Sequence, residues 1–327
     1  MRWRTWQLAM TEALYGPGGF YRTPGAPAAH FRTSAHLGEA FADALLTLAA
    51  RVDAELAHPD PFDLVDLGAG GGELLTALQT RAPTVAPGLA DRLRLTGVDV
   101  ADRPPGLPAG IGWAAEVPGI TGLLVANEWL DNVPLDIAEF SAGGPRLLQV
   151  DEAGNERPGP PLPARDNEWL ARWLPGAAGN AEIGRAEIGA TRDAAWARAV
   201  ERVTRGAAVA IDYGATAAAT LTGFRAGREV AAVPDGTCDL TASVFFPSVA
   251  AAGARAAGQP ATTLTQRDAL RALGVEARRP PPGLATDDPK AYVAALAALS
   301  RRAALVDPAG LGAFTWLVQP VGIGAPL

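Results

Sequence analysis

The sequence predicts an α/β protein built on an open, mostly parallel, Rossmann-like sheet. The first observation is an apolar run at 61–65 that leads into Asp66 and then breaks into Leu67-Gly68-Ala69-Gly70-Gly71-Gly72. A buried strand followed by a glycine-rich turn is how such a sheet lets a nucleotide-like cofactor approach its backbone. The second observation is a strand-like run at 93–100, which carries Asp99 near its end. Together they indicate a small-molecule cofactor site near residue 70.

The other elements follow from hydrophobic periodicity and from glycine and proline breaks. Apolar and β-branched runs predict further strands at 111–114, 120–126, 207–212 and 314–318. Helices are predicted at 3–15, 37–56, 165–174 and 191–205, with more helical segments, broken by prolines, between 240 and 305. Gly143-Gly144 joins 137–140 to 146–150 and predicts a hairpin. The Gly/Pro-rich loop from Tyr15 to Ser34 is expected to be a lid over the cofactor, or else a surface connector.

The glycine spacing discriminates between cofactors. A dinucleotide fingerprint starting at Gly68 needs a glycine at 73, where the chain has Glu73. One starting at Gly70 needs a glycine at 75, where the chain has Leu75. A phosphate-binding P-loop needs a lysine, and the only lysine of the chain is Lys290. Cofactors recognised through phosphate groups are therefore disfavoured.

S-adenosylmethionine suits the pattern, because its methionyl tail carries an ammonium and a carboxylate but no phosphate. We expect Asp66 to face the ammonium, while Gly68, Gly70 and Gly72 let the backbone pass beneath the adenosyl group. Asp99, one helix further along, is the expected ribose ligand. A glycine turn that binds no ligand is the alternative.

Composition limits the class of protein. The 327 residues suffice for two domains or for one α/β unit with an insertion. With 48% hydrophobic and 19% charged residues, and no apolar run near roughly 18 residues, a soluble globular protein is expected. The net charge of −7 disfavours nucleic-acid or membrane binding. Cys238 is the single cysteine, and it forms no metal-ligand spacing with the three histidines, so we expect no metal and a cytoplasmic location.

Eight motifs, in order along nearly the whole chain, resemble those of the MidA-like methyltransferases. They are ALYGPGGFY (13–21), FRTS (31–34), DLGAGGGELL (66–75), ANEWLDNVP (126–134), AIDYG (210–214), TLTGFR (220–225), DLTASV (239–244) and LTQRDALRALGV (264–275). This family includes the mitochondrial complex I assembly methyltransferase, which methylates an arginine of a respiratory-complex subunit. The resemblance implies a class I S-adenosylmethionine methyltransferase sheet, mostly parallel with one antiparallel strand.

The resemblance also implies how the chain is divided. Residues 1–58 are expected to form N-terminal helices and a cofactor lid, and 136–199 an inserted hairpin and helical substrate region. Residues 59–135 and 200–327 then form the methyltransferase core with C-terminal helical additions. Thr33 and Ser34 of the FRTS motif are implied as cofactor contacts.

The strand that ends in Asn127 and Glu128 carries the expected catalytic residues. It reaches the carboxyl edge of the sheet beside the cofactor strand, where α/β enzymes place acceptor groups. We expect Glu128 to pair with a guanidinium acceptor and orient one nitrogen toward the methyl group. Asn127 is a candidate for acceptor and cofactor binding, and Asp131 for assisting Glu128. Glu128 and Asp131 are otherwise acids favoured by a helix N-terminus. Trp113 is interpreted as an adenine neighbour or as a core residue.

The chain departs from the family pattern at four acidic or histidine positions. His30 and His36 stand where MidA-like proteins carry acids, and Ser243 and Phe245 stand where they carry His and Asp. Three functions therefore stay open: a protein arginine methyltransferase, a small-molecule methyltransferase, and a noncatalytic assembly factor that binds S-adenosylmethionine. The expected partner is an acceptor protein or small molecule, without nucleic acid or membrane insertion, and a homodimer is left open.

Overall fold

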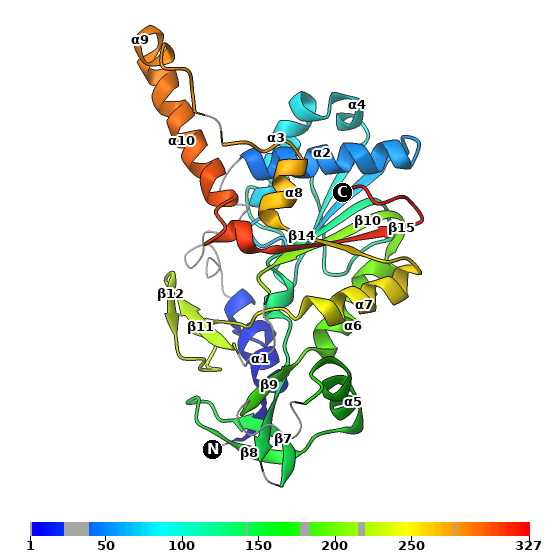
Figure 1. Ribbon diagram of the computed structural model, residues 1–327, viewed down its shortest axis with the longest axis vertical. Helices are drawn as coiled ribbons and strands as arrows, with labels where there is room; N and C mark the ends of the chain where they lie inside the picture. Colours follow the sequence, from blue (N-terminus) through cyan, green and yellow to red (C-terminus); the bar gives the residue numbers. More distant parts are fainter. Residues whose placement is uncertain (1, 23–38, 142, 177–183, 215–219, 278) are drawn as a thin grey trace.

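A computed structural model describes residues 2–22, 39–141, 143–176, 184–214, 220–277 and 279–327, and Figure 1 shows its arrangement. A seven-stranded sheet forms its centre. In spatial order its strands are β14 (Thr262–Thr265), β15 (Thr315–Val321), β10 (Val203–Asp212), β5 (Ile120–Asn127), β2 (Phe62–Leu67), β3 (Leu93–Val98) and β4 (Gly112–Ala114). The five strands from β10 to β4 are parallel, and β15 is antiparallel to both of its neighbours. The predicted mostly parallel sheet with one antiparallel strand is confirmed.

Helices cover both faces of this sheet, which is why β2 is buried along its whole length. Leu64 points to the face covered by α2 (Glu39–Glu55), α3 (Glu73–Val85) and α8 (Gln266–Ala272). Val65 points to the face covered by α6 (Ala190–Glu201) and α7 (Phe246–Ala257). In Figure 1 these two groups of helices lie on opposite sides of the strands. The continuous apolar runs of the sequence thus become a doubly covered sheet.

Two smaller antiparallel sheets lie beside the main one. The first comprises β1 (Arg4–Thr5), β7 (Gly144–Val150), β6 (Asp136–Ser141) and β9 (Arg185–Ile188), with β8 (Glu156–Pro161) paired to β7. The second comprises β12 (Arg228–Val230), β11 (Thr222–Arg225) and β13 (Asp239–Thr241). Helix α1 (Trp6–Tyr15) joins them, because its Met10 and Leu14 share one apolar cluster with Leu148 of β7 and Leu240 of β13.

The connection between β5 and β6 decides where these sheets stand. Strand β5 runs through the short 3-10 helix η4 (Leu130–Asn132) into β6. The added sheets therefore join the main sheet at its carboxyl edge.

The remaining described helices are η1 (Phe20–Arg22), α4 (Pro87–Ala90), α5 (Ala164–Trp173), α9 (Leu284–Asp287), α10 (Pro289–Leu305) and η5 (Leu311–Ala313). The domain limits at 58, 135 and 199 stay a prediction.

Two sequence predictions need correction, and one strand was not predicted. Residues 4–5 were expected in a helix but form β1, because they pair with Val150 and Gln149 of β7. Residues 203–205 were expected to end a helix but begin β10, whose first residue pairs with Ile120. The strand that was not predicted is β8, in the proline-rich stretch before α5; among the described strands it pairs with β7 alone. Proline lacks an N–H donor and is tolerated there because β8 is an edge strand.

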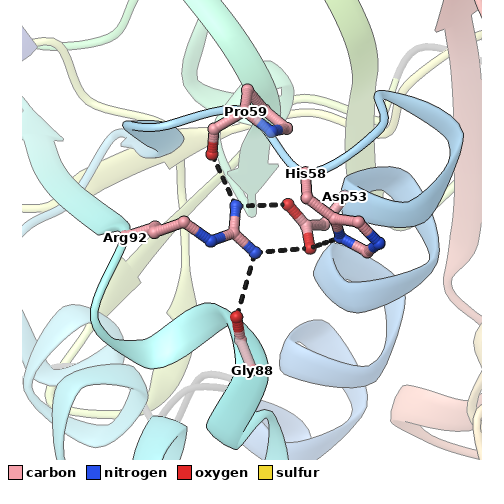
Figure 2. A network of polar contacts seen from close by, with 5 residues as sticks. All are labelled: Asp53, His58, Pro59, Gly88 and Arg92. Carbon is pink, nitrogen blue, oxygen red and sulfur yellow. Dashed lines mark hydrogen bonds and ion pairs between the residues drawn. The ribbon is translucent and has the colours of Figure 1, made fainter.

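A polar network stands at the amino end of the sheet, just before β2 and β3 begin (Figure 2). Arg92 donates from both terminal nitrogens to the Asp53 carboxylate at 2.8 Å, and also to the backbone carbonyls of Pro59 and Gly88. His58 Nδ1 lies 2.7 Å from Asp53 Oδ2. Burial alone would raise the pKa of Asp53, yet hydrogen bonds from Arg92 and His58 hold it below its ordinary value. The network thus fixes the entry into both strands, away from the carboxyl edge.

Among the described residues, no helix is long and apolar enough to cross a membrane. Nor do the described histidines, cysteines and carboxylates gather into a group of three or more suited to a metal ion.

Candidate functional site

The glycine loop after β2 has the backbone that only glycine adopts easily. Gly68, Gly70 and Gly72 have φ values of 79°, 53° and 76°. A Cβ atom on Gly68 would lie 2.9 Å from the Trp129 ring, and one on Gly72 would lie 2.5 Å from a Leu107 methyl carbon. A Cβ on Gly70 would meet nothing within 4 Å. Packing against Trp129 therefore explains Gly68, and the positive φ explains Gly72, whereas Gly70 borders open space that suits a ligand.

Two carboxylates flank this loop. Asp99 accepts a hydrogen bond of 2.9 Å from Gly70 N and another of 2.9 Å from Ala101 N. Burial raises the pKa of Asp99, and these hydrogen bonds oppose the rise. Burial, together with the negative charges of Asp99 and Glu73, raises the pKa of Asp66 to about 7. A cation beside Asp66 would relieve that repulsion, which is the role expected of the cofactor's ammonium.

Two residues near Asp99 are candidate contacts for an adenine ring, the aromatic Trp113 and the apolar Val100. Trp113 donates from Nε1 to the Ala101 carbonyl at 3.0 Å, and its ring lies over Gly97 in the sheet, against the apolar core. Val100, the next residue after Asp99, is 43% exposed and was not singled out from the sequence. Its position beside the expected ribose ligand makes Val100 a candidate contact for the adenine ring.

The end of β5 carries a strained residue and an unpartnered amide oxygen. Glu128 has a φ of 51°, a conformation that costs a non-glycine residue about 1–2 kcal/mol, and its N–H donates to the Ile211 carbonyl at 2.8 Å. Asn127 donates from Nδ2 to Glu128 Oε1 at 3.2 Å. Asn127 Oδ1 is buried and has no hydrogen-bond partner among the described residues. Buried polar atoms are normally paired, so this oxygen indicates a place for a ligand's donor.

Beyond Glu128 stand three buried carboxylates, Asp131, Asp212 and Asp239, which we call the acid cluster. Asp131 N donates to Asp212 Oδ2 at 3.1 Å, and Thr241 Oγ1 donates to Asp131 Oδ2 at 2.7 Å. Asn132 Nδ2 donates to Asp239 Oδ1 at 2.8 Å. Within the part of the chain that is described, Asp131 Oδ1 is buried without a partner. One carboxylate oxygen of the cluster is therefore left to receive a donor.

Burial and mutual charge repulsion raise the pKa values of the carboxyls in the acid cluster. Burial raises the pKa of all three carboxyls, and the charge of Asp131 raises those of Asp212 and Asp239 further, bringing Asp239 to about 7. Arg192 of α6 opposes this at Asp131 and Asp212 and is itself 2% exposed. Its guanidinium donates to four backbone carbonyls, those of Asp131 (2.6 Å), Val133 (3.1 Å), Ala242 (2.9 Å) and Ser243 (2.8 Å). Arg192 thus fastens the segment after β5 to the segment after β13.

The start of the predicted lid reaches the same place. Tyr15 donates from its hydroxyl to the Asn132 carbonyl at 3.1 Å, and its ring stacks on Tyr21 with centroids 5.6 Å apart. Tyr21 donates to Asp239. Burial and the neighbouring acids raise the pKa of both tyrosines, so both stay neutral. The two tyrosines therefore cover one side of the acid cluster.

The structure brings most of the predicted site residues to one edge of the sheet. Those residues are Asp66, Gly68, Gly70, Gly72, Asp99, Asn127 and Glu128, with Asp131 in the adjoining acid cluster. Thr33 and Ser34, like His30 and His36, lie outside the described residues. Sequence reasoning missed Asp212, Asp239 and Arg192. Asp212 had a visible signal as the last residue of a predicted strand, whereas nothing local marked Arg192.

The two departures near the end of the chain have different surroundings. Ser243 is held by its backbone, because its N–H donates to Thr220 Oγ1 at 2.8 Å and its carbonyl accepts from Arg192 at 2.8 Å. Phe245 stacks edgewise near Trp169 and Trp173, with ring centroids 6.1 and 6.2 Å away. An aspartate at this position would face an aromatic cluster. The phenylalanine thus suits its aromatic surroundings.

The sheet order, the single antiparallel strand and the glycine loop define a class I S-adenosylmethionine-dependent methyltransferase. Residues 42–265 match the family Methyltransf_28, described as "Putative S-adenosyl-L-methionine-dependent methyltransferase". The chain belongs to this family, and the predicted resemblance to MidA-like methyltransferases is confirmed. Its methyl donor is accordingly S-adenosylmethionine, as predicted.

Solved structures agree with this assignment. One is a protein from Burkholderia thailandensis bound to S-adenosylhomocysteine, with a TM-score of 0.79 and 25% identity over 99% of this chain and 89% of that chain. Another is a native structure of an uncharacterized COG1565 superfamily protein from Burkholderia thailandensis, with a TM-score of 0.76 and 25% identity over 99% of this chain and 88% of that chain. No curated protein matches the sequence.

Proposed function

We propose that this methyltransferase transfers its methyl group to a side-chain nitrogen of arginine in a protein. The observation that carries the proposal is the acid cluster beside Glu128, with Asp131 Oδ1 buried and unpartnered among the described residues. A guanidinium offers five N–H donors in a planar fork that matches carboxylates. A guanidinium would bring a positive charge to the acid cluster and a hydrogen-bond donor to Asp131 Oδ1.

The cofactor side of the proposed site consists of the glycine loop and its flanking polar groups. Asp66 would meet the ammonium of S-adenosylmethionine, Asp99 its ribose, and Asn127 Oδ1 a further donor; Thr33 and Ser34 are proposed contacts from the lid. The open space at Gly70 and the raised pKa of Asp66 both fit such a group. When bound, S-adenosylmethionine supplies a methyl carbon attached to a positively charged sulfur.

The residues of this chain then have three tasks. Glu128 would orient the guanidinium by a charge-assisted hydrogen bond, so that one nitrogen points toward the methyl carbon. The acid cluster would hold the rest of the guanidinium. Asp131, whose pKa burial raises, would accept at Oδ1 the proton that the methylated nitrogen gives up. Aligned geometry of this kind supplies on the order of 7–11 kcal/mol of a bimolecular barrier.

The location and partner of the protein belong to the same proposal. A single cysteine, Cys238, buried and unpaired, favours a reducing compartment, and we propose the cytoplasm. The division into a lid (1–58), a core (59–135 and 200–327) and an inserted substrate region (136–199) is likewise proposed. In this scheme the small sheets attached to the carboxyl edge provide the surface on which an acceptor protein rests.

The test is transfer of isotope-labelled methyl groups. The purified chain is incubated with methyl-labelled S-adenosylmethionine and a protein extract, and the products are separated by size and sequenced by mass spectrometry. We expect label on arginine side chains, and none with Gly70→Val, which serves as the blank. Label confined to small molecules would replace the proposal by a metabolite methyltransferase. Measurable cofactor binding with no label at all would favour a noncatalytic assembly factor.

A further inference from the structure

Two of the sequence motifs, AIDYG (210–214) and DLTASV (239–244), carry hydroxyl groups that the proposed reaction leaves without a task. Tyr213 directly follows the last residue of β10, and Thr241 is the last residue of β13. Thr241 is 3% exposed, and Tyr213 is partly buried. Buried hydroxyl groups are normally hydrogen-bonded, so the direction of each bond says which neighbour each proton serves.

The two hydroxyls form a chain that ends on Asp131. Thr241 Oγ1 donates to Asp131 Oδ2 at 2.7 Å, and the Tyr213 hydroxyl is hydrogen-bonded to Thr241 Oγ1. A hydroxyl has a single proton, and that of Thr241 is used on Asp131. Tyr213 is therefore the donor in its bond to Thr241. Both protons point toward the carboxylate, which is the direction that an ionised Asp131 requires.

Tyr213 sustains this direction because it keeps its proton. Burial and the negative charges of Asp131 and Asp212 raise the pKa of the Tyr213 hydroxyl. The Tyr213 ring packs on Phe314, with ring centroids 5.9 Å apart. Its backbone is held as well, since its N–H donates to Asp212 Oδ1 at 2.9 Å and its carbonyl accepts from Val244 N at 2.9 Å. The hydroxyl is thus aimed at Thr241 by contacts along the whole residue.

Asp131 is held by the same segments. Its N–H donates to Asp212 Oδ2 at 3.1 Å, so the Asp212 carboxylate joins the backbones of Asp131 and Tyr213. Its carbonyl accepts from Ala242 N, the residue after Thr241, at 3.1 Å. Asp131 is therefore fixed at its N–H, its carbonyl and Oδ2. Within the described part of the chain, Oδ1 is the oxygen that stays without a partner.

The hydrogen bond from Thr241 also acts on the charge of Asp131. Burial raises the pKa of Asp131, and this hydrogen bond opposes the rise more than the charge of Arg192 does. Buried hydrogen bonds in series polarise one another, so the bond from Tyr213 strengthens Thr241 as a donor. The other titratable groups that face the acid cluster are Glu128 after β5, Asp212 of β10, Asp239 of β13, Tyr15 of α1 and Tyr21 of η1.

We propose that Tyr213 and Thr241 are positioning residues, whose hydroxyls donate in series to Asp131 Oδ2 and keep this carboxylate ionised with Oδ1 free for the acceptor. The inference rests on the proposed function, in which Asp131 receives the proton of the methylated nitrogen. In that step the nitrogen–carbon bond forms while the carbon–sulfur bond breaks, and the sulfur keeps the electron pair. The proton leaves the nitrogen for Asp131 Oδ1, and neither hydroxyl gains or loses one.

The pKa of Asp131 tests the inference directly. It is measured by NMR of the aspartate carboxyl carbons in the labelled full chain, and Asp131→Asn assigns the signal. Thr241→Val keeps the shape of the side chain without the hydroxyl, and should raise the pKa of Asp131 by about one unit. Tyr213→Phe should raise it by less, because the bond from Thr241 remains. Thr241→Ser restores the hydroxyl and should return the pKa to that of the wild type.

Thr222→Val is the matched control. Thr222 pairs with Thr241 in the sheet, but its hydroxyl donates to the Val230 carbonyl at 3.1 Å, on the opposite side from β13. Its loss should therefore leave the pKa of Asp131 unchanged. Should Thr241→Val fail to fold, Tyr213→Phe decides by the same kind of shift, because it removes one oxygen from a partly buried side chain.

The pH profile of arginine methylation should follow the same order. Ionised Asp131 is the form that accepts a proton, so the rate rises as pH increases through the pKa of Asp131. Thr241→Val should displace this limb upward by about one pH unit, which lowers the rate there about tenfold. Thr241→Ser and Thr222→Val should follow the wild type.

The outcomes separate this inference from the proposed function. A pKa of Asp131 that neither Thr241→Val nor Tyr213→Phe moves would overturn the inference. So would a methylation profile that stays in place while the pKa of Asp131 moves. A wild type that labels no arginine would instead refute the proposed function, and the NMR titration would then decide the role of the two hydroxyls by itself.

Discussion

Replacing Arg192 by methionine should destabilise the protein strongly, because this side chain supports the acid cluster from inside the fold. Its guanidinium is 2% exposed and makes four hydrogen bonds to backbone carbonyls. A hydrogen bond from a charged donor contributes about 1.5–3 kcal/mol, so four would total roughly 6–12 kcal/mol if they were additive. The desolvation of the guanidinium offsets much of that sum.

The net loss expected is therefore about 3–5 kcal/mol, the range found when one partner of a buried charged group is removed. Methionine also withdraws the positive charge that lowers the pKa of Asp131 and Asp212, so both carboxyls become harder to ionise. With a urea m-value of about 3 kcal/mol/M for a chain of this size, the midpoint should fall by about 1–2 M at pH 7.

The assay is urea unfolding followed by circular dichroism, with Arg198→Met as the control. Arg198 lies on the same helix but is exposed, so its loss should move the midpoint little. Arg192→Lys keeps the charge but not the planar fork, and should fall between the wild type and Arg192→Met. A loss below about 1 kcal/mol for Arg192→Met, or an equal loss for Arg198→Met, would refute the reasoning.

Three further predictions concern the edge of the sheet. Gly70→Val should abolish cofactor binding measured by calorimetry, because a branched side chain at φ 53° enters the open space beside the loop. The control Gly88→Val on α4 should leave cofactor binding intact. Unchanged cofactor affinity of Gly70→Val would place the cofactor elsewhere. Glu128→Gln should keep cofactor affinity but lower turnover at least about a hundredfold if Glu128 orients a cationic acceptor, and full activity would exclude that role. The folded pKa of Asp66, about 7, exceeds the ordinary value of about 3.9, so the folded state holds the extra proton. Its unfolding free energy should fall as pH rises from about 4 to about 7 and then level off, and Asp66→Asn should flatten that slope in urea titrations.

The cofactor half of the site was predictable because its signals are local. Asp66, the glycines that follow it and Asp99 each stand at a strand end that the sequence marks by apolar runs. The structure distinguishes the three glycines: packing against Trp129 explains Gly68, the φ of 76° explains Gly72, and open space distinguishes Gly70. The number and spacing of the glycines in the sequence do not reveal these differences.

The acid cluster was only partly predictable, because it is assembled from distant segments. Asp131 was singled out beside Glu128, but its partner Thr241 lies 110 residues further along the chain. Arg192 resembles any other arginine of an amphipathic helix until its carbonyl partners are known. The edge strand β8 was missed for a similar reason, since its prolines argue against a strand while pairing with β7 allows one.

The most direct test of the proposed site is a crystal structure of this chain with S-adenosylhomocysteine. The account predicts the amino group of the ligand near Asp66, its ribose hydroxyls on Asp99, and its sulfur facing Glu128 and the acid cluster. A ribose held away from Asp99, or a sulfur that faces away from Glu128, would contradict it.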